Sequence, residues 1–428
     1  MKILWLCNIS LPKIAEVLKR KQNDYGGWLT GLSNGLLKNN EISLSVCFPE
    51  RDFYAVEAGS TENLKYYAFP EFNYHDFQGR FNLESALEEI VLKSKPDIIN
   101  IHGTESANSY VMTKVCQRLG IIDKVVVSIQ GLVSVYARHY DAGLPNRVVN
   151  GFTIKELIKN NNIRQSRKEF VRKGEHEVQT IKNVKHIIGR TDWDRACAEQ
   201  INPDAKYHFC NETLRDSFYE HSWDISKCKK HSIFISQAGY QIKGLHWVLE
   251  SMPEVLKRFP DAHVYVAGND ITKYDTMSAK LRIGSYGKYI RSLIKKYGLN
   301  SSITFIGPLN EADMCKQYLA SNVFVSASSI ENESNSISEA KIMGVPVIAS
   351  FVGGVTNRIT HEYDGMIYQH DAPYMLSYYI KKVFRNNSLA ETLSRNARIE
   401  ANKINNRETN VRAIISAYKE IYSKNTEI

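Results

Sequence analysis

The sequence predicts an α/β protein built from two doubly wound, Rossmann-like domains. In both halves of the chain, short runs rich in Val and Ile alternate with longer amphipathic stretches, which is the pattern of βαβ units. The length of 428 residues exceeds the size at which a single hydrophobic core stops growing. Two domains, each with its own parallel sheet, are therefore expected.

Buried strands are expected in both halves of the chain. Those of the first half cover residues 2–8, 43–48, 97–103, 124–131 and 186–191. Those of the second half cover residues 231–239, 262–268, 303–308, 323–328 and 346–351. Ligands of doubly wound sheets bind outside the carboxyl ends of the strands, so the residues after each strand are the candidates for a site. We expect the two domains to face a central cleft at these ends.

A polar stretch from Asn202 to Lys230 separates the two sets of strands. We place the domain boundary within it, which gives an N-terminal domain of residues 1–205 and a C-terminal domain of residues 206–400. The last segment, residues 401–428, has apolar residues near helical spacing. We expect it to form a helix that packs back on the N-terminal domain.

The composition indicates a soluble globular protein, with 43% hydrophobic and 24% charged residues. The seven cysteines are scattered and form no CxxC pair, which predicts reduced thiols in a cytoplasmic protein, with no zinc site and no disulfide framework. The apolar run at the N-terminus is too short for a signal peptide or a membrane span, and it is read as the first strand.

The net charge of +9 is concentrated in residues 151–190, where ten Lys and Arg face four Glu. Such a basic segment can meet an anionic membrane surface, an anionic substrate or nucleic acid, or it can be a solvated helix face. No zinc finger, RRM or helix-turn-helix pattern accompanies it, which argues against nucleic acid. We therefore expect a peripheral contact with an anionic membrane through this segment.

Two groups of residues follow strands of the first half. Gly26 and Gly27 precede a helical pattern, where glycines let the backbone approach a phosphate at a helix N-terminus, although a plain structural turn is an alternative. His102 ends the strand at 97–103 and is followed by Glu105. A histidine there can donate to a substrate oxygen or a phosphate, or it can be a satisfied structural residue.

The strand at 124–131 is followed by further polar side chains. Gln130, Arg138 and His139 are expected near one rim, where they can recognise a polyhydroxyl acceptor. In the second half, Lys243 and Gly244 open a helix after a strand and a turn. A lysine at a helix start is repelled by the positive end of the helix dipole, so its position is favourable only if an anionic phosphate lies between them.

The stretch "ASSIENESNSISEAKIMGVPVIAS" carries the strongest local pattern. Glu331 lies in a polar loop, and Glu339 lies on the helix that follows and ends at Gly344. Both carboxylates can accept hydrogen bonds from sugar hydroxyls. The N–H groups at the helix start, Asn335, Ser336 and Ile337, can bind phosphate. A glutamate near a helix start is also favoured by the dipole whatever the function.

Together these pieces resemble the retaining family 4 glycosyltransferases of the GT-B fold, also known as glycosyl transferases group 1, and in particular the bacterial enzymes of surface-polysaccharide assembly. The signature of that family is E-x7-E followed by a G-x-P-V strand, and here Glu331, Glu339 and "MGVPVIAS" match it. The other matching pieces follow in the family's order: "GGW", "PDIINIHG", "KGL", "ITFIGPLNEADM" and "FVGGVTNRI". The resemblance spans nearly the whole chain.

The resemblance implies a role for each matching residue. Glu331 would bind donor-sugar hydroxyls and Glu339 the nucleotide ribose. Lys243 would neutralise the departing diphosphate with help from backbone N–H groups, His102 would lie beside the transferred sugar, and Leu309 would touch the nucleobase through its backbone. The domains of residues 1–205 and 206–400 would bind the acceptor and the nucleotide sugar, respectively. Family members need no metal in the site, so no cofactor is expected, and the donor is expected to be a UDP- or GDP-sugar.

Two departures from the family are visible. Gln237 stands six residues before Lys243, where the family usually has an arginine, so another cation such as Arg190 or Arg358 would have to supply that charge. The Gly-Phe-Gly inside the signature is replaced by "NESNS", and Glu333 in this loop has no counterpart. Glu333 is interpreted as a donor-specificity residue or as a solvated one.

The sequence therefore predicts a cytoplasmic glycosyltransferase, of the retaining hexosyltransferase type, that moves a sugar from a nucleotide donor to a glycan or lipid-linked acceptor. Two alternatives stay open. One is a sugar-nucleotide epimerase with a similar fold, and the other is a non-catalytic subunit that binds nucleotide sugar or glycan.

Overall fold

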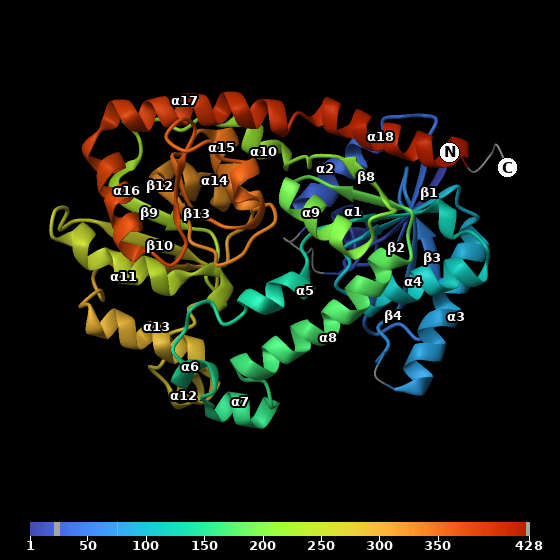
Figure 1. The fold of residues 1–428 in the computed structure, drawn as a ribbon, viewed down its shortest axis with the longest axis horizontal. Helices are drawn as coiled ribbons and strands as arrows, with labels where there is room; N and C mark the ends of the chain where they lie inside the picture. Colours follow the sequence, from blue (N-terminus) through green and yellow to red (C-terminus); the bar gives the residue numbers. More distant parts are fainter. Residues whose placement is uncertain (21–25, 75, 425–428) are drawn as a thin grey trace. The chain divides into compact units, whose positions relative to one another are not determined.

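The structure is a computed structural model, and it describes residues 1–20, 26–74 and 76–424 (Figure 1). The chain forms two compact units. The first unit contains residues 1–134, 172–215 and 405–428, and the second contains residues 135–171 and 216–404. Each unit is an α/β body around a parallel sheet, as the sequence predicts.

The first unit holds an eight-stranded sheet in the order β3-β4-β2-β1-β5-β6-β7-β8. All neighbouring pairs are parallel except β3 and β4, which are antiparallel. The central strands are buried along most of their length, which fits their continuous Val and Ile runs. The strands are β1 (Lys2–Leu6), β2 (Ser43–Glu50), β3 (Glu57–Ser60), β4 (Lys65–Pro70), β5 (Ile98–His102), β6 (Val125–Ser128), β7 (His186–Gly189) and β8 (Lys206–Phe209).

The second unit holds a six-stranded parallel sheet in the order β11-β10-β9-β12-β13-β14. The order reverses at β9, which lies between β10 and β12. This reversal is the switch point at which doubly wound sheets bind ligands. The strands are β9 (Lys229–Ile235), β10 (His263–Ala267), β11 (Ile303–Gly307), β12 (Ser321–Ser326), β13 (Val347–Phe351) and β14 (Met366–Gln369).

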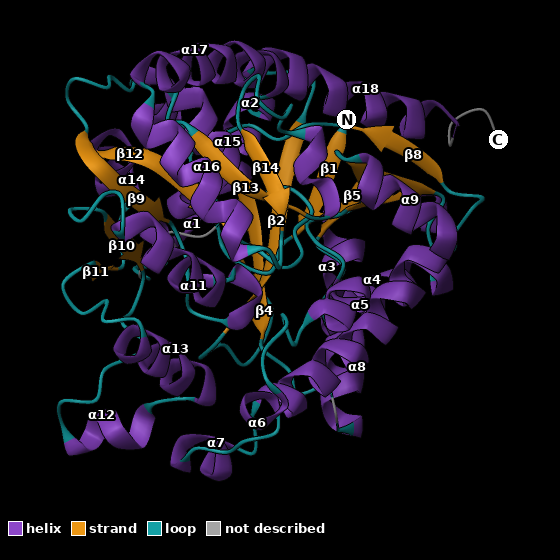
Figure 2. Cartoon of the chain, turned by 60° about the vertical axis from the view of Figure 1, so that its left-hand side comes forward, coloured by secondary structure: helices purple, strands orange, loops and turns teal. Residues whose placement is uncertain are grey.

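Helices follow the strands in both units (Figure 2). Those of the first unit are α1 (Pro12–Val17), α2 (Gly27–Leu36), α3 (Phe77–Ser94), α4 (Ala107–Arg118), the 3-10 turn η1 (Ile122–Lys124), α9 (Asp192–Ile201) and α18 (Arg407–Lys424). Two helices run across the limits of the units, α5 (Val133–Tyr136) and α8 (Ile163–Lys182).

The helices of the second unit alternate with its strands and include several short 3-10 turns. They are η2 (Ala137–His139), α6 (Asn146–Val149), α7 (Ile154–Lys159), α10 (Asp216–Glu220), η3 (Gln241–Lys243), α11 (Leu245–Leu256), α12 (Met277–Arg282), α13 (Ser285–Lys296), α14 (Glu311–Ala320), α15 (Asn335–Met343), η4 (Gly353–Asn357), α16 (Pro373–Arg385) and α17 (Asn387–Ile404). Helix α11 packs against α16, and α15 packs against α17.

The last helix, α18, is part of the core of the first unit. Ile414, Tyr418 and Ile421 are buried in the same apolar cluster as Trp5. The Tyr418 hydroxyl accepts hydrogen bonds from Trp5 Nε1 (3.1 Å) and from Asn100 Nδ2 (2.6 Å). Strands β1 and β5 are thus tied to the C-terminal helix by buried polar contacts.

The limits of the units differ from the domain limits predicted from the sequence. The first unit reaches Arg215 rather than residue 205, because residues 206–209 form β8 at the edge of its sheet. Residues 135–171 lie in the second unit, because the chain there bonds to its helices. Gln241 Nε2 donates to the Tyr140 carbonyl (3.0 Å), and His246 Nε2 lies 2.9 Å from the Ala142 carbonyl oxygen. The second unit ends at Ile404, four residues beyond the predicted limit of 400.

Candidate functional site

The candidate site of the second unit lies where β9 and β12 end. Ser236 and Gln237 directly follow β9, and together with Lys243, Ser334 and Ser336 they line a small cavity beside the end of β12. Ser236 Oγ is 2.8 Å from Ser336 Oγ, so a hydrogen bond joins the end of β9 to the start of α15. The sequence therefore brings together residues that are a hundred positions apart.

Lys243 and Glu331 form an ion pair in this site. Lys243 Nζ is 2.7 Å from Glu331 Oε2, and the two side chains are only 20% and 10% exposed. Burial opposes the charge of Lys243, but the Glu331 carboxylate and the Tyr240 hydroxyl outweigh it and raise the pKa of the lysine above its ordinary value. Lys243 is therefore a permanent cation at the edge of the cavity.

Two glycines make this pair possible. Gly244 precedes α11 with φ of +71°, and a Cβ atom there would lie 1.8 Å from the Ala327 carbonyl oxygen. Gly353 has φ of +47°, and its Cβ would lie 1.9 Å from the Glu331 carbonyl oxygen, which also accepts a hydrogen bond from Gly354 N at 3.0 Å. The "KGL" and "FVGG" motifs therefore hold the backbones on either side of the pair in place.

The loop after Glu331 is held by residues that the sequence analysis did not assign. Asn332 N donates to the Tyr136 hydroxyl (2.8 Å), and Ser328 Oγ donates to Glu331 Oε2 (3.2 Å). Glu333 is not solvated, because it is buried and its Oε1 is 2.8 Å from Arg358 Nε in an ion pair. The interpretation of Glu333 as a solvated residue was wrong, and its interpretation as a donor-specificity residue stays a prediction.

At the start of α15, only some of the backbone N–H groups are available to bind a phosphate. Ile337 N donates to the Ser334 carbonyl (2.9 Å), so it is engaged inside the turn rather than available for phosphate as predicted. Asn335 and Ser336 occupy the first turn, where a helix provides no internal acceptor for its N–H groups. Asn335 Oδ1 is buried without a hydrogen-bond partner among the residues that the structure describes. An unsatisfied buried acceptor at this position favours binding of a ligand donor.

Glu339 lies on the helix after Glu331, as expected, while the predicted contacts of Glu339 to ribose and of Leu309 to the base stay predictions. Glu339 lies on α15, and its Oε2 accepts a hydrogen bond from the buried Tyr318 hydroxyl (3.3 Å). The same hydroxyl donates to the Ser336 carbonyl (3.0 Å), which fixes the first turn of the helix. Leu309 lies half-buried in the loop between β11 and α14.

The missing arginine at Gln237 is not replaced by either of the two cations suggested above. Arg358 is engaged with Glu333, as described. Arg190 belongs to the first unit, where its Nη1 is 2.9 Å from Glu212 Oε1 and 2.7 Å from the Ile129 carbonyl oxygen. Both guanidinium groups are buried in structural contacts, so Lys243 is the cation that lines this cavity.

The first unit holds a second cluster, around the end of β5. His102 lies between Trp5 and Trp28, with ring centroids 4.5 Å and 5.4 Å away. Both of its ring nitrogens are buried without a hydrogen-bond partner in the described part of the chain, and burial lowers its pKa to about 3. Neutral His102 therefore offers one donor and one acceptor that the folded unit leaves unused.

Glu105 lies beside this histidine. Its Oε1 accepts a hydrogen bond from Asn8 Nδ2 (2.9 Å), while its buried Oε2 has no such partner within residues 1–20, 26–74 and 76–424. Burial raises the pKa of the Glu105 carboxyl group. Gly103, with φ of +89°, lies under the carboxylate, and its Cβ would be 2.6 Å from Glu105 Oε2.

The predicted glycine turn is present at the start of α2. Gly26 caps the helix with φ of +81°, a conformation that favours glycine. A Cβ on Gly27 would lie 2.5 Å from the side chain of Arg215, so the arginine packs directly on this glycine. The sequence analysis missed Arg215, because it lies in the polar stretch that was read as a connection between domains.

The remaining acceptor-side residues are divided between the two units. Gln130 belongs to the first unit, and its Oε1 is 3.3 Å from Arg190 Nη2. Arg138 and His139 belong to the second unit and are exposed in η2. The common rim expected for these three side chains stays a prediction, because the chain passes from one unit to the other between Gln130 and Arg138.

The basic segment of residues 151–190 is likewise divided between the units after residue 171. Several of its cations are paired: Arg167 with Asp141 (2.8 Å), Lys185 with Asp123 (2.9 Å) and Arg190 with Glu212. The uniform patch expected from the charge count is thus broken up. Within the described residues, no helix is long and apolar enough to span a membrane, and no cluster of three or more metal-ligating side chains is found.

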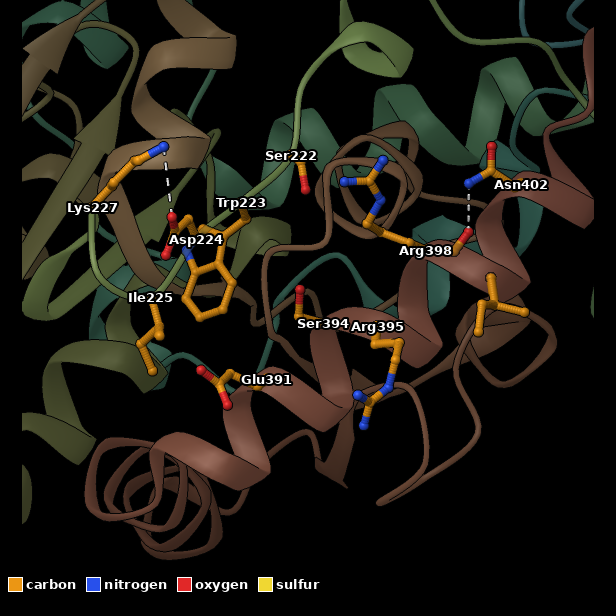
Figure 3. Close-up of a pocket in the computed structure, with 11 residues that line it drawn as sticks. Ser222, Trp223, Asp224, Ile225, Lys227, Glu391, Ser394, Arg395, Arg398 and Asn402 are labelled. Carbon is orange, nitrogen blue, oxygen red and sulfur yellow. Dashed lines mark hydrogen bonds and ion pairs between the residues drawn. The ribbon is translucent and has the colours of Figure 1, made fainter.

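A wider groove of about 800 Å³ lies elsewhere in the second unit, between residues 222–227 and α17 (Figure 3). Arg398 and Ser222 lie across from each other in this groove, while Arg395 points outward. Trp223 Nε1 donates to the Ser321 carbonyl (2.8 Å), which anchors the groove floor below β12. The predicted site residues do not line this groove, because it lies where β9 and β12 begin rather than where they end.

Comparison with known proteins agrees with this arrangement. Residues 217–400 match the family model described as glycosyl transferases group 1. An uncharacterized glycosyltransferase of Methanocaldococcus jannaschii is 25% identical over 180 residues, which is 42% of this chain and 42% of that protein. The matched segment thus spans less than half the length of that relative.

Two solved structures are similar over nearly the whole chain. Sucrose-phosphate synthase from Thermosynechococcus elongatus has a TM-score of 0.70 and 14% identity, covering 99% of this chain and 100% of that one. HepE of Anabaena, solved in complex with UDP and glucose, has a TM-score of 0.67 and 15% identity, covering 98% and 99%. At these identities the likeness shows the fold, which is of the GT-B class. Residues 217–400, less than half of the chain, are thus similar to the glycosyl transferases group 1 family.

Proposed function

We propose that this protein is a glycosyltransferase that moves a sugar from a nucleotide-sugar donor to a glycan or lipid-linked glycan acceptor. The observation that carries the proposal is the Lys243–Glu331 pair at the switch point of the second sheet, beside the start of α15. A UDP- or GDP-sugar is the proposed donor, and the solved HepE complex with UDP and glucose supports this kind of ligand.

The ion pair has a clear use in such a reaction. When a nucleotide sugar enters, its diphosphate competes with Glu331 for Lys243, so the lysine turns to the phosphates and the carboxylate is released to accept hydrogen bonds from sugar hydroxyls. The Asn335 and Ser336 N–H groups add donors for phosphate. As the bond to the sugar breaks, negative charge grows on the leaving phosphate, and a fixed cation there stabilises the transition state.

Other features of the proposal rest on the family resemblance. Transfer would proceed with retention, as a hexosyl transfer, without a divalent metal, and in the assembly of a surface polysaccharide. Glu339 would bind the ribose, Leu309 the base, and His102 the region beside the transferred sugar. Gly26, Gly27, Glu105, Gln130, Arg138 and His139 are proposed as further contacts to donor or acceptor. The protein would act in the cytoplasm at a membrane surface, where a lipid-linked acceptor is found.

A thermal-shift screen against UDP-, GDP- and ADP-sugars tests the donor part of the proposal. A ligand that binds the native state alone raises Tm by mass action. One of the three nucleotide sugars should raise Tm for the unaltered protein and should do so much less for Lys243→Gln. Lys257→Gln, at the exposed end of α11, is the matched control. No shift with any nucleotide sugar would contradict the proposal.

A non-catalytic binding subunit is the second candidate, because the neutral Gln237 lines the cavity at the position where the resemblance implies an arginine. Lys243→Gln distinguishes the two, since it keeps a donor toward Glu331 and removes the charge. For an enzyme, transfer to acceptor should fall by about 100-fold or more while Tm without ligand stays close to that of the unaltered protein. Unchanged glycan production in cells would instead favour the binding subunit.

A further inference from the structure

Helix α7 turns its apolar side away from the protein. Ile154, Leu157 and Ile158 have the i, i+3, i+4 spacing of one helix stripe, and they are 51%, 63% and 80% exposed. A surface helix of a globular protein normally directs such a stripe toward the core. On α7 the stripe is uncovered.

The opposite side of α7 is polar and buried, which fixes this orientation. Glu156 accepts hydrogen bonds from Ser285 N (2.7 Å) and Ser285 Oγ (2.5 Å) at the start of α13. It also forms a capping box with Thr153, whose N–H donates to Glu156 Oε2 (2.8 Å). Turning the apolar stripe inward would break these buried bonds, so its exposure is built into the fold.

A second helix extends the exposed surface. Helix α12 contacts α7, and the two lie side by side in both views of the second unit (Figures 1 and 2). Its Met277 and Leu281, one turn apart, are 71% and 45% exposed. We define the apolar face of α7 and α12 by the following side chains: Phe152, Ile154, Leu157, Ile158, Met277 and Leu281.

On the two helices of this face, cations outnumber carboxylates. Lys155 and Lys159 lie on α7, and Lys280 and Arg282 lie on α12. Within the described part of the chain, none of these four forms an ion pair, and Glu156, the one acid on either helix, is buried against Ser285. A second copy of the chain would bring the same cations together, so self-association is disfavoured. An anionic lipid surface complements both the apolar groups and the charge.

We infer that the apolar face of α7 and α12 binds the surface of an anionic bilayer, with its apolar side chains in the interfacial region and its lysines near the headgroups. This inference replaces the broad basic segment of residues 151–190 with a defined surface in the second unit. It rests on the proposed function only because a lipid-linked acceptor would lie at a membrane surface. Binding to the bilayer itself does not require sugar transfer.

Cosedimentation of the full chain with vesicles tests the inference. The unaltered protein should bind vesicles of phosphatidylcholine with phosphatidylglycerol and bind pure phosphatidylcholine much less. Replacing both apolar side chains in Leu157→Ser/Ile158→Ser should lower the partition coefficient at least about tenfold. The Lys155→Glu/Lys159→Glu variant should have a lower partition coefficient on anionic vesicles only. Added salt should likewise weaken binding of the unaltered protein to anionic vesicles.

The control is Phe77→Ser, which removes an exposed large apolar side chain of the first unit and should leave binding unchanged. The inference is overturned if the unaltered protein does not bind anionic vesicles, or if the Leu157→Ser/Ile158→Ser variant binds as well as the unaltered protein. It is also overturned if the face is covered by a second copy, seen as a dimer that the double variant converts to a monomer. Nucleotide-sugar thermal shifts on the same samples report separately on the proposed function, since these substitutions leave the donor cavity intact.

Discussion

The fold holds the ring of His102 buried and neutral, with no hydrogen bond to either nitrogen among the described residues. Its ring is buried between two tryptophans, and neither nitrogen has a protein hydrogen-bond partner among the described residues. Such a group costs stability unless a ligand satisfies it. Its position at the end of β5 is therefore consistent with the role that the family resemblance assigns to it.

The buried histidine predicts a pH dependence of stability. The pKa of His102 is about 3 in the folded protein and about 6.5 when unfolded, so between these values only the unfolded chain takes up the proton. The contribution of neutral His102 to the free energy of unfolding is fully present above pH 6.5. It is lost as the pH falls below this value, and the loss is about 2 kcal/mol at pH 5. Urea unfolding of the unaltered protein and of His102→Phe at pH 7.5 and pH 5 measures this.

The change in the free energy of unfolding between the two pH values is compared between the two proteins, because other buried histidines titrate in both of them. His246, for example, has a pKa lowered by burial to about 4. Between pH 7.5 and pH 5, the free energy of unfolding of His102→Phe should fall less than that of the unaltered protein. An equal loss in both would show that His102 is protonated in the folded state.

At the residue scale, the sequence singled out charged groups of the second unit but not the residues that hold the loop around them in place. Lys243, Glu331 and Glu339 were found because they form a spaced pattern next to strands. Tyr136 was not assigned a role, and the ion pair of Arg358 with Glu333 was not predicted, because each residue contacts its partner across a stretch of chain that no local spacing reveals. Ile337 was predicted as a phosphate donor because a helix start was recognised but its first-turn hydrogen bond was not.

At the scale of an element, the turn that joins β9 to α11 depends on the absence of one side chain. Gly244 combines a left-handed conformation with close contact to the Ala327 carbonyl, which belongs to the loop after β12. Any Cβ would push the start of α11 away from that loop. Lys243 would move with it, since it is the preceding residue.

Gly244→Ala should therefore lower the free energy of unfolding by roughly 2 to 4 kcal/mol, from strain and displacement together. Gly239→Ala is the matched control five residues earlier in the same connection, because a Cβ there meets no atom within 4 Å and its φ is not in the left-handed region. Chemical denaturation of both variants measures the difference. Equal stability of the two would show that the Gly244 turn relaxes without cost.

The elements themselves were predicted unevenly. All the strands expected from Val- and Ile-rich runs are present, because burial on both faces leaves a continuous apolar signal. Four further strands were missed: β3, β4, β8 and β14. β3, β8 and β14 lie at sheet edges and are only four residues long. β8 was read as part of a linker because its exposed, polar sequence carries little apolar pattern.

At the scale of the whole molecule, the fold class and the two-unit division follow from the sequence, but the path of the chain does not. The chain passes between the units after residues 134, 171, 215 and 404. Sequence composition changes little at these points, and the long helix α8 runs through one of them without interruption. The predicted cleft between the two domains stays a prediction.

The position of α18 in the core of the first unit predicts the effect of truncation. A chain ended after Ile404 would lack Tyr418 and expose the apolar cluster around Trp5, while the second unit would keep all its residues. The first unit should lose its cooperative unfolding transition and its protection from hydrogen exchange. Exchange measured by mass spectrometry on both chains tests this, and full protection of β1 and β5 in the shorter chain would contradict it.

The repeated passage of the chain between the units also bears on how such a protein can change during evolution. The residues that build the candidate donor site, 216–404, are inserted within the sequence of the first unit, which resumes at residue 405. A single recombination event near residue 215 would replace α18 together with residues 216–404, so the rest of the first unit would be joined to a foreign α18. Because that helix carries Tyr418 into contact with Trp5 and Asn100, the exchange would disrupt the core of the first unit. New donor specificities should therefore arise more readily by point substitution around Glu331 or by replacement of the whole insert than by exchange of the C-terminal half.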